Sequence, residues 1–317
     1  MTSIPLITLE TIQASLTEAD ILDAVQGALV AQARGQVNSP PPGMLQLDEP
    51  AGECHIKYGH LDGSDTFVIK IACGFYENPK IGLSANNGMM LVFDAKTGAP
   101  LCILDDRGWL TNARTAAAGA LAARAGAPPG VASVGIIGSG EQAELQAKWT
   151  ARLLGIESVV VYGRTARHVK DYAERMARDG FSVTIAPDIT SLMKRCNLVI
   201  TTTPSNAALI LADDVRPGTH IVAMGADNPG KQELEAALFP RAAVIMVDDH
   251  GQCVHHGDLG HAVRGGLVPE DADIDLGAVL AGDEPGRLSD DDITIVDLTG
   301  IAAEDMAVAG LVWSRQG

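Results

Sequence analysis

The stretch that most constrains the fold is a glycine-containing turn that directly follows a short apolar run. Val131 to Ile137 reads VASVGII, and GSGEQA follows it and ends at Ala143. A polar, helix-favouring segment comes next, so the order is strand, tight turn and helix. The turn has the form G-x-G-x-x-A, which is typical of a dinucleotide-binding βαβ unit. This stretch predicts a nucleotide site at the end of a buried strand.

The small residues of the turn each have a physical role. Gly138 allows the sharp turn, Gly140 lets a pyrophosphate approach the backbone, and Ala143 lets the helix lie close to the strand. The phosphates then meet the free N–H groups at the positive end of that helix. The predicted cofactor-binding residues of the turn are Gly138, Ser139, Gly140, Glu141 and Gln142.

The composition limits the class of protein. The chain has 317 residues, enough for two ordinary domains, and 46% are hydrophobic but only 4% aromatic. The core must therefore be aliphatic, as in α/β enzymes. The formal net charge of −17 argues against nucleic acid or an anionic membrane surface as a partner, since both need basic patches. A small anionic substrate stays compatible with this charge, because a local cluster of Lys and Arg can outweigh the overall field.

Cysteine and histidine usage indicates a cytoplasmic protein without a metal centre. The five cysteines are scattered and show no C-x-x-C spacing, which is typical of reduced thiols. The first ten residues lack the features of a signal peptide, and no stretch reaches the roughly 20 apolar residues that span a membrane. His255 and His256 are adjacent, so their side chains diverge, and no third ligand stands at a diagnostic spacing. We expect no metal site.

The first part of the chain predicts an α+β domain built on a mainly antiparallel sheet. Thr17 to Asp20 resembles a capping box, and apolar residues at helical spacing follow it. Four strand-like runs come next, at 53–58, 67–73, 89–93 and 101–104. An alanine-rich helix over 111–125 follows, with Thr111 as its N-cap.

After the glycine turn, short strands and helices alternate as far as the apolar run at 293–297. This alternation is the pattern of a doubly wound parallel sheet. A last helix over 302–313 is expected to return to the first domain. The predicted fold class is therefore α/β, with a Rossmann dinucleotide-binding domain at 127–297 and an α+β substrate domain at 1–126 with 298–317.

Two residues after the second Rossmann strand bear on the choice of cofactor. An acidic residue at this strand end normally accepts the ribose 2′-OH of NAD, and none is present. Arg164 and Thr165 offer a cation and a hydroxyl instead, which suit the 2′-phosphate of NADP. The alternative is a surface arginine at the start of a helix. Thr202 and Thr203 follow another strand and are expected at the cofactor edge of the sheet.

Three cations in the first domain are candidates for substrate chemistry. Lys70 lies between two Ile residues, so it is either partly buried with a lowered pKa that suits proton transfer, or exposed on the solvated sheet face. Lys57 shares its strand face with His55. Arg114, in the first turn of the helix predicted from Thr111, repels the positive end of the helix dipole. It is held either by a ligand anion, such as a carboxylate, or by a structural ion pair.

A candidate carboxylate lies in the second domain. The segment GADNPGK at 225–231 follows the strand at 220–224, so Asp227 would project from the carboxyl edge of the sheet. Ligands bind at that edge in open α/β sheets. The alternative is that Asp227 only forms a turn.

Five groups of segments, taken together, resemble the ornithine cyclodeaminase/mu-crystallin family, which includes alanine dehydrogenases and ketimine reductases. They are VIK at 68–70 with GFYENP at 74–79, LTNARTAA at 110–117, GSGEQA at 138–143, GADNPGKQE at 225–233, and DLTG at 297–300 with DMA at 305–307. They cover nearly the whole chain in the family's order and are far more specific than the glycine turn alone. The segment 81–98, with NGMM at 87–90, is most similar to the branch linked to ectoine utilisation.

The resemblance implies roles for these residues. Lys70 and Asp227 match the family's catalytic lysine and aspartate, and Arg114 matches its arginine for the substrate carboxylate. The resemblance also implies a homodimer formed through the first domain. In mu-crystallin-like members an Arg-Thr pair after the second strand accompanies NADPH, which agrees with the interpretation of Arg164 and Thr165.

One departure from the family concerns the substrate carboxylate. Many members carry an arginine just after a Pro-Pro run, whereas this chain reads PGMLQ at 42–46. Ornithine-specific activity is therefore in doubt. We hypothesise that Lys57 supplies the missing cation.

The predicted function is that of an NAD(P)-dependent oxidoreductase that interconverts a small 2-imino acid, such as a ketimine, and an amino acid. Two alternatives stay open. The first is cyclodeamination of the ornithine type, in which NAD borrows and returns a hydride and ammonia leaves. The second is a mu-crystallin-like protein that binds NADPH and a small ligand.

Overall fold

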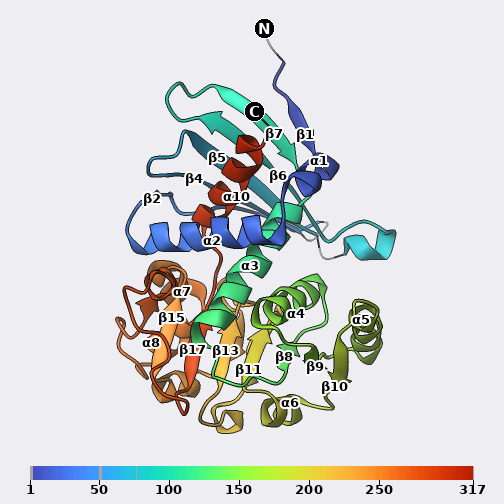
Figure 1. Ribbon diagram of the computed structural model, residues 1–317, viewed down its shortest axis with the longest axis vertical. Coiled ribbons are helices and arrows are strands. Elements are labelled where there is room, and N and C mark those ends of the chain that lie inside the picture. The colour runs from blue at the N-terminus through green and yellow to red at the C-terminus, as the bar shows by residue number, and fades with distance from the viewer. Residues whose placement is uncertain (1–2, 50–51, 76, 317) are drawn as a thin grey trace. The chain divides into compact units, whose positions relative to one another are not determined.

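The computed structural model describes residues 3–49, 52–75 and 77–316. The chain divides into two compact units (Figure 1): Met1–Arg114 with Ile301–Gly317, called unit 1 here, and Thr115–Gly300, called unit 2. The division falls inside helix α3 (Trp109–Gly126). The boundary expected from the sequence lies at the end of this helix, because a continuous helix carries no sequence mark where its packing partners change.

Unit 2 holds an eight-stranded parallel sheet, which confirms the predicted Rossmann architecture. The strand order is β10-β9-β8-β11-β13-β17-β15-β16. The strands are β8 (Val134–Ile137), β9 (Ser158–Tyr162), β10 (Ser182–Ile185), β11 (Leu198–Thr201), β13 (His220–Ala223), β15 (Val244–Val247), β16 (Ile274–Asp275) and β17 (Thr294–Asp297). The central strands are apolar and buried, as expected of a parallel sheet covered on both faces.

The remaining elements of unit 2 connect these strands. The helices are α4 (Glu141–Leu154), α5 (Ala166–Arg178), α6 (Ile189–Arg195), α7 (His250–His256), α8 (Asp258–Arg264) and α9 (Leu276–Ala281), with 3-10 turns η2 (Ala212–Asp214) and η3 (Ala236–Arg241). A small parallel pair joins β12 (Asn206–Ile210) to β14 (Gln232–Leu234). Strand β8 lies between β9 and β11, so the order reverses there, and this switch point is where open α/β sheets bind ligands.

Unit 1 is built on a seven-stranded sheet, mainly antiparallel as predicted. Its main path is β1-β7-β6-β5-β4-β2, and β3 also pairs with β4. The strands are β1 (Leu6–Thr8), β2 (Val37–Asn38), β3 (Gly43–Leu47), β4 (Gly52–Leu61), β5 (Thr66–Gly74), β6 (Asn86–Asp94) and β7 (Pro100–Asp105). Its other elements are helices α1 (Leu9–Ser15), α2 (Glu18–Ala33) and α10 (Ala302–Ser314), and the 3-10 turn η1 (Asn78–Ile81).

Helix α10 covers one face of this sheet, and helix α2 packs against α10. Helix α2 begins with the predicted capping box, in which Thr17 and Asp20 bond each other's backbone N–H groups. Helix α10 packs beside α2 and on β4 and β5 (Figure 1). Among the described residues, no helix is long and apolar enough to cross a membrane.

Candidate functional site

The side chain of Lys70 is buried in unit 1. It projects from β5, is 3% exposed, and its Nζ lies 2.6 Å from Oδ2 of Asp305 on α10. Burial lowers the pKa of Lys70 to about 7; the charge of Asp305 opposes the shift, and those of Arg114 and Lys57 add to it. Of the two placements that the sequence left open, the structure therefore shows the buried one. Lys70 can both hold and release a proton near neutral pH.

Arg114 makes a buried ion pair with the same helix. Its Nε donates to Oδ1 of Asp305 at 3.1 Å, and its Nη1 donates to Oε2 of Glu304 at 2.6 Å. The structural ion pair, one of the two alternatives above, is thus present, and it holds the guanidinium next to Lys70.

The predicted start of the helix that carries Arg114 was wrong. Helix α3 begins at Trp109 rather than after Thr111, so Arg114 lies in its second turn. The physical reason is Asp106, whose Oδ2 accepts from the N–H of Leu110 at 2.9 Å and so provides the cap.

Glu304 and Asp305 are two residues of this cluster that were not among the predicted site residues. Asp305 bonds both Lys70 and Arg114, and although burial alone would raise the pKa of Asp305, these two cations lower it. Two adjacent acidic residues in the otherwise apolar segment 301–313 were the available signal. Such residues are rarely fully buried unless they are paired.

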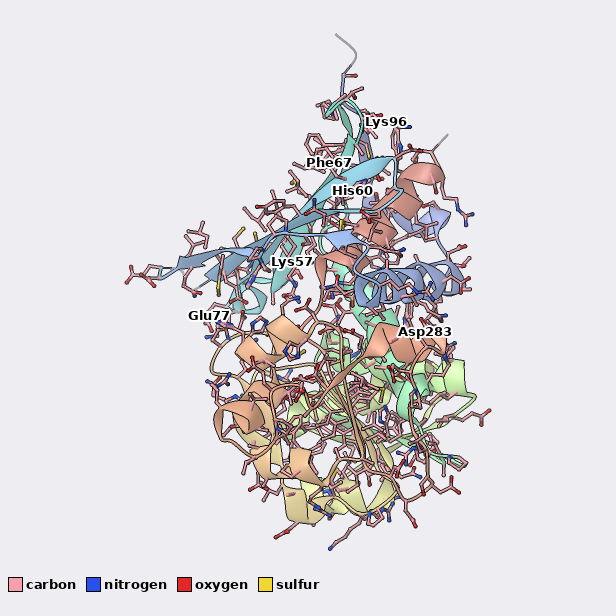
Figure 2. The ribbon with its side chains drawn as sticks, turned by 90° about the vertical axis from the view of Figure 1, so that its left-hand side faces the viewer. Lys57, His60, Phe67, Glu77, Lys96 and Asp283 are labelled. Atoms are coloured by element: carbon pink, nitrogen blue, oxygen red, sulfur yellow. The ribbon has the colours of Figure 1, made fainter. Side chains whose placement is uncertain are left out.

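Lys57 lies next to Lys70. Lys57, labelled in Figure 2, is half-buried on β4, and the strand register places it directly opposite Lys70. Its charge acts on both Lys70 and Asp305. His55, on the same face of β4, pairs with Glu53 at 3.5 Å. Unit 1 therefore brings three of the predicted site residues, Lys57, Lys70 and Arg114, into one cluster.

The glycine turn of unit 2 has the geometry that a dinucleotide needs. Gly138 has φ 131°, and a Cβ there would lie 2.4 Å from Oγ1 of Thr202, so only glycine fits. A Cβ at Gly140 would meet nothing within 4 Å, and this residue caps α4 without a side-chain hydrogen bond. The helix start is thus open to an approaching anion. Ala143 is fully buried against the sheet.

Arg164 and Thr165 follow a segment that lies against this turn. Gly138 donates its N–H to the carbonyl of Tyr162 at 2.9 Å, and a Cβ at Gly163 would lie 3.1 Å from Oγ of Ser139. Both Arg164 and Thr165 are exposed. The structure therefore places a cation and a hydroxyl at the edge of the predicted nucleotide site.

The loops after β11 and β13 hold the other predicted residues of unit 2. Thr202 donates its N–H to Ile137 at the end of β8, 2.9 Å away. Asp227 lies after β13, is half-exposed, and pairs with Nζ of Lys231 at 2.5 Å. Thr203 donates its N–H and its hydroxyl to a buried carboxylate, Glu233, which was not among the predicted site residues.

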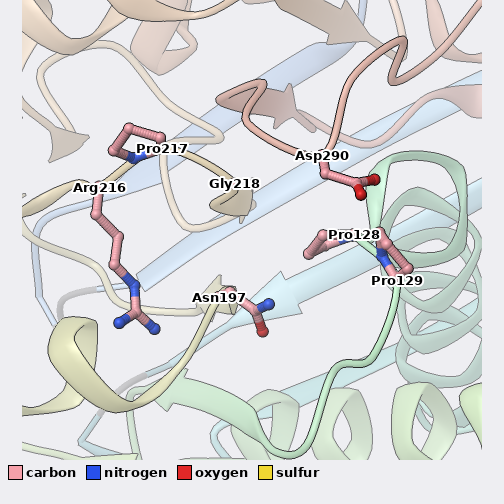
Figure 3. Close-up of a pocket in the computed structure, with 7 residues that line it drawn as sticks. All are labelled: Pro128, Pro129, Asn197, Arg216, Pro217, Gly218 and Asp290. Atoms are coloured by element: carbon pink, nitrogen blue, oxygen red, sulfur yellow. The ribbon is translucent and has the colours of Figure 1, made fainter.

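Unit 2 also has a hollow of ≈ 400 Å³ at the end of its sheet where the strands begin, opposite the end that carries the glycine turn (Figure 3). It lies where β11 and β13 begin, and it contains none of the predicted site residues. Its lining residues are Pro128, Pro129, Asn197, Arg216, Pro217, Gly218 and Asp290. One exposed cation and one exposed carboxylate do not define a ligand, so this hollow is not part of the candidate site.

Comparisons with known proteins agree with this geometry. The model of the ornithine cyclodeaminase/mu-crystallin family matches residues 5–316, so the chain belongs to this family. An uncharacterized cyclodeaminase of Sinorhizobium fredii is 36% identical over 94% of this chain and 91% of its own. The iminosuccinate reductase of Paracoccus denitrificans is 33% identical, over 94% of this chain and 92% of its own.

A solved structure extends the agreement to the whole fold. An archaeal alanine dehydrogenase, described as a dimer with bound NAD, superposes with a TM-score of 0.90 and 32% identity over 98% of this chain and 95% of its own. The predicted family and fold class are therefore confirmed. These relatives also confirm the predicted class of enzyme, an imino-acid or amino-acid oxidoreductase, and keep cyclodeamination open. Tyr76, within the family-like segment 74–79, lies outside the described residues.

The buried cluster predicts a large stability effect for Asp305→Asn. The substitution removes the negative charge that Lys70 and Arg114 share, and breaking a buried ion pair costs about 3–5 kcal/mol of the free energy of unfolding. Chemical denaturation should show this loss. Asp65→Asn is the matched control, since Asp65 pairs with Lys96 at 2.7 Å in solvent, and its midpoint should not move. Equal effects of the two substitutions would contradict this account.

Proposed function

We propose that this protein is a nicotinamide-dependent reductase that converts a small 2-imino acid into the 2-amino acid, or catalyses the reverse. The observation that carries the proposal is the buried Lys70, with a pKa near neutrality and an adjacent guanidinium. The same chain has a glycine turn that fits a dinucleotide. The iminosuccinate reductase and alanine dehydrogenase among its relatives catalyse, by their names, reactions of this class.

The chain's own residues would do the following. The turn at 138–143 would hold the pyrophosphate, with Thr202 and Thr203 beside it. A bound reduced nicotinamide supplies a hydride, which the imine carbon accepts. Lys70 would give a proton to the imine nitrogen in the reductive direction and take it back in the oxidative one. Asp227 is the alternative proton donor.

Arg114 and Lys57 would bind the substrate carboxylate. Arg114 is held by Glu304 and Asp305, so its orientation is fixed before the substrate arrives. Lys57 is half-buried, and no arginine follows the Pro-Pro run of this chain. Lys57 would therefore be the second cation.

Cyclodeamination is the second candidate function. It would use the same residues, because a hydride is first removed from the amino acid and later returned to a cyclic imine. The relative named a cyclodeaminase supports this candidate. Only the reductase would show net oxidation of the reduced cofactor, and this distinguishes it from the cyclodeaminase.

We further propose a homodimer formed through unit 1, in a cytoplasmic protein. The sheet face opposite α2 and α10 exposes Ile56, Tyr58 and Met89, each 39–40% accessible. Such an apolar patch is typical of an association surface. The five free thiols agree with the location. Sedimentation velocity should show a dimer, and a monomer at micromolar concentration would exclude it.

The reductase should oxidise NADPH or NADH steadily when it is given linear and cyclic 2-imino acids. Lys70→Ala should lower kcat by about 10²–10⁴-fold, the usual contribution of a positioned proton donor. Its nucleotide Kd should stay unchanged. Because Lys70 must be protonated and its pKa is about 7, the reductive kcat/KM should fall as pH rises above 7. Ammonia release from L-ornithine without net absorbance change would support the cyclodeaminase instead.

Lys57→Ala tests the second cation. Losing one charge-assisted hydrogen bond of about 1.5–3 kcal/mol should raise the substrate KM by roughly 10–100-fold. Steady-state kinetics with the best imino acid gives this value. Lys80→Ala is a control of the same type, since Lys80 is exposed and pairs with Glu77. An unchanged KM for Lys57→Ala would refute the proposed role.

Arg164→Ala tests the preference for NADP. The substitution removes the cation proposed to meet the 2′-phosphate, so the Kd for NADPH should rise about tenfold or more while that for NADH changes little. Nucleotide fluorescence titration measures both constants. Arg178→Ala, in the last turn of α5 and also exposed, is the matched control. Equal losses for the two nucleotides would show that Arg164 does not read the 2′ position.

A further inference from the structure

Two loops of unit 2 carry predicted site residues, and one buried side chain bonds both loops. Thr202 and Thr203 follow β11, and Asp227 follows β13. We propose that Glu233, in the middle of β14, is a positioning residue that fixes the Asp227 loop against the Thr202–Thr203 loop. The catalytic consequence of this inference rests on the proposed function, whereas the structural consequence does not.

Glu233 is fully buried and accepts four hydrogen bonds. Its Oε1 accepts from the N–H and the hydroxyl of Thr203, at 2.6 and 2.7 Å. Its Oε2 accepts from the hydroxyl of Thr201 at 2.6 Å and from the N–H of Gly225 at 2.7 Å. Two of the four donors are backbone groups, so the carboxylate fixes the course of the chain in both loops.

The backbone packs closely around this carboxylate. A Cβ at Gly225 would lie 2.1 Å from the carbonyl oxygen of Thr203 and 2.6 Å from Cδ of Glu233. The two loops can therefore approach each other only because residue 225 is glycine. Two residues after Gly225 stands Asp227, so a shift of the loop start would move the predicted catalytic carboxylate.

Glu233 is itself held from its other side. Oδ1 of Asp258, the first residue of α8, accepts from the N–H groups of Glu233 and Leu234 at 2.8 and 2.9 Å. Burial and, secondly, the charge of Asp258 raise the pKa of Glu233 to about 7, and the hydrogen bonds from Thr201 and Thr203 oppose this shift. Glu233→Gln keeps the size and shape of the side chain and replaces one acceptor oxygen by an NH₂ group, which makes it a suitable variant.

The test compares amide hydrogen exchange in Glu233→Gln and in the full-length wild-type protein. The new amide NH₂ cannot accept, so it faces at least one donor without bonding it. Exchange at Thr203 and Gly225 should speed up at least about tenfold, with little change elsewhere. Glu235→Gln is the matched control, because the Glu235 carboxylate accepts from the N–H of Ala212 at 2.6 Å, and Ala212 lies in neither loop. Unchanged exchange in Glu233→Gln would overturn the proposal.

A second variant tests the proposal if Glu233→Gln does not fold. Thr201→Val removes one donor to Oε2 and leaves the carboxylate in place, so it should raise exchange at the same two amides by a smaller factor. In that case, unchanged amide exchange at Thr203 and Gly225 in Thr201→Val would overturn the proposal.

The catalytic arm uses the imino-acid assay. Glu233→Gln should lower kcat about 10–100-fold, as expected when a catalytic group is misplaced by about 1 Å. In an Asp227→Asn background the same substitution should cost less than about threefold, because both act through one group. Additive effects would overturn the link to Asp227. If the wild-type protein turns over no imino acid, the proposed function fails, and the exchange experiment still decides the role of Glu233.

Discussion

The structure of unit 1 depends on one carboxylate, Asp305, which bonds Lys70 through one oxygen and Arg114 through the other. Glu304 pairs with the same guanidinium, so two carboxylates balance two cations, and all four side chains are nine-tenths or more buried. Such buried charges persist only when they neutralise each other, since the desolvation of an unpaired ion costs several kcal/mol. The cluster joins β5, α3 and α10, which are far apart in the sequence. Folding of the last helix onto the sheet is therefore coupled to the formation of the cluster.

In unit 2, backbone N–H groups rather than cations stabilise the buried carboxylates. Asp248 accepts from the N–H groups of Thr299 and Gly300, and Asp258 accepts from those of Glu233 and Leu234. Asp248 directly follows β15, at a strand end of the parallel sheet, whereas Asp258 is the first residue of α8. Each satisfies backbone N–H groups that are buried inside unit 2. Glu233, whose N–H bonds Asp258, in turn bonds the loops that carry Thr203 and the predicted catalytic Asp227.

Much of this architecture could be predicted from the sequence because the signals were local. The apolar strands of unit 2, its glycine turn and the capping box of α2 all depend on neighbouring residues. The short strands β1, β2 and β3 were not predicted, since two lie at sheet edges and β3 pairs on one side only. The start of α3 was misplaced because Asp106 caps it from three residues away. The partners of Lys70 could not be predicted, because Asp305 is contributed by the far end of the chain.

The cluster around Lys70 also suggests why a carboxylate substrate suits this site. Among the charges that act on Lys70 are one carboxylate, Asp305, and two cations, Arg114 and Lys57. In the proposed reaction a substrate carboxylate would bring a further negative charge beside them. An added negative charge favours the protonated form, so the pKa of Lys70 would rise on binding. Lys70 would then keep its proton until the hydride reaches the imine carbon and the nitrogen becomes basic. Substrates without a carboxylate would leave Lys70 partly deprotonated at neutral pH, and the enzyme would discriminate against them in kcat as well as in binding.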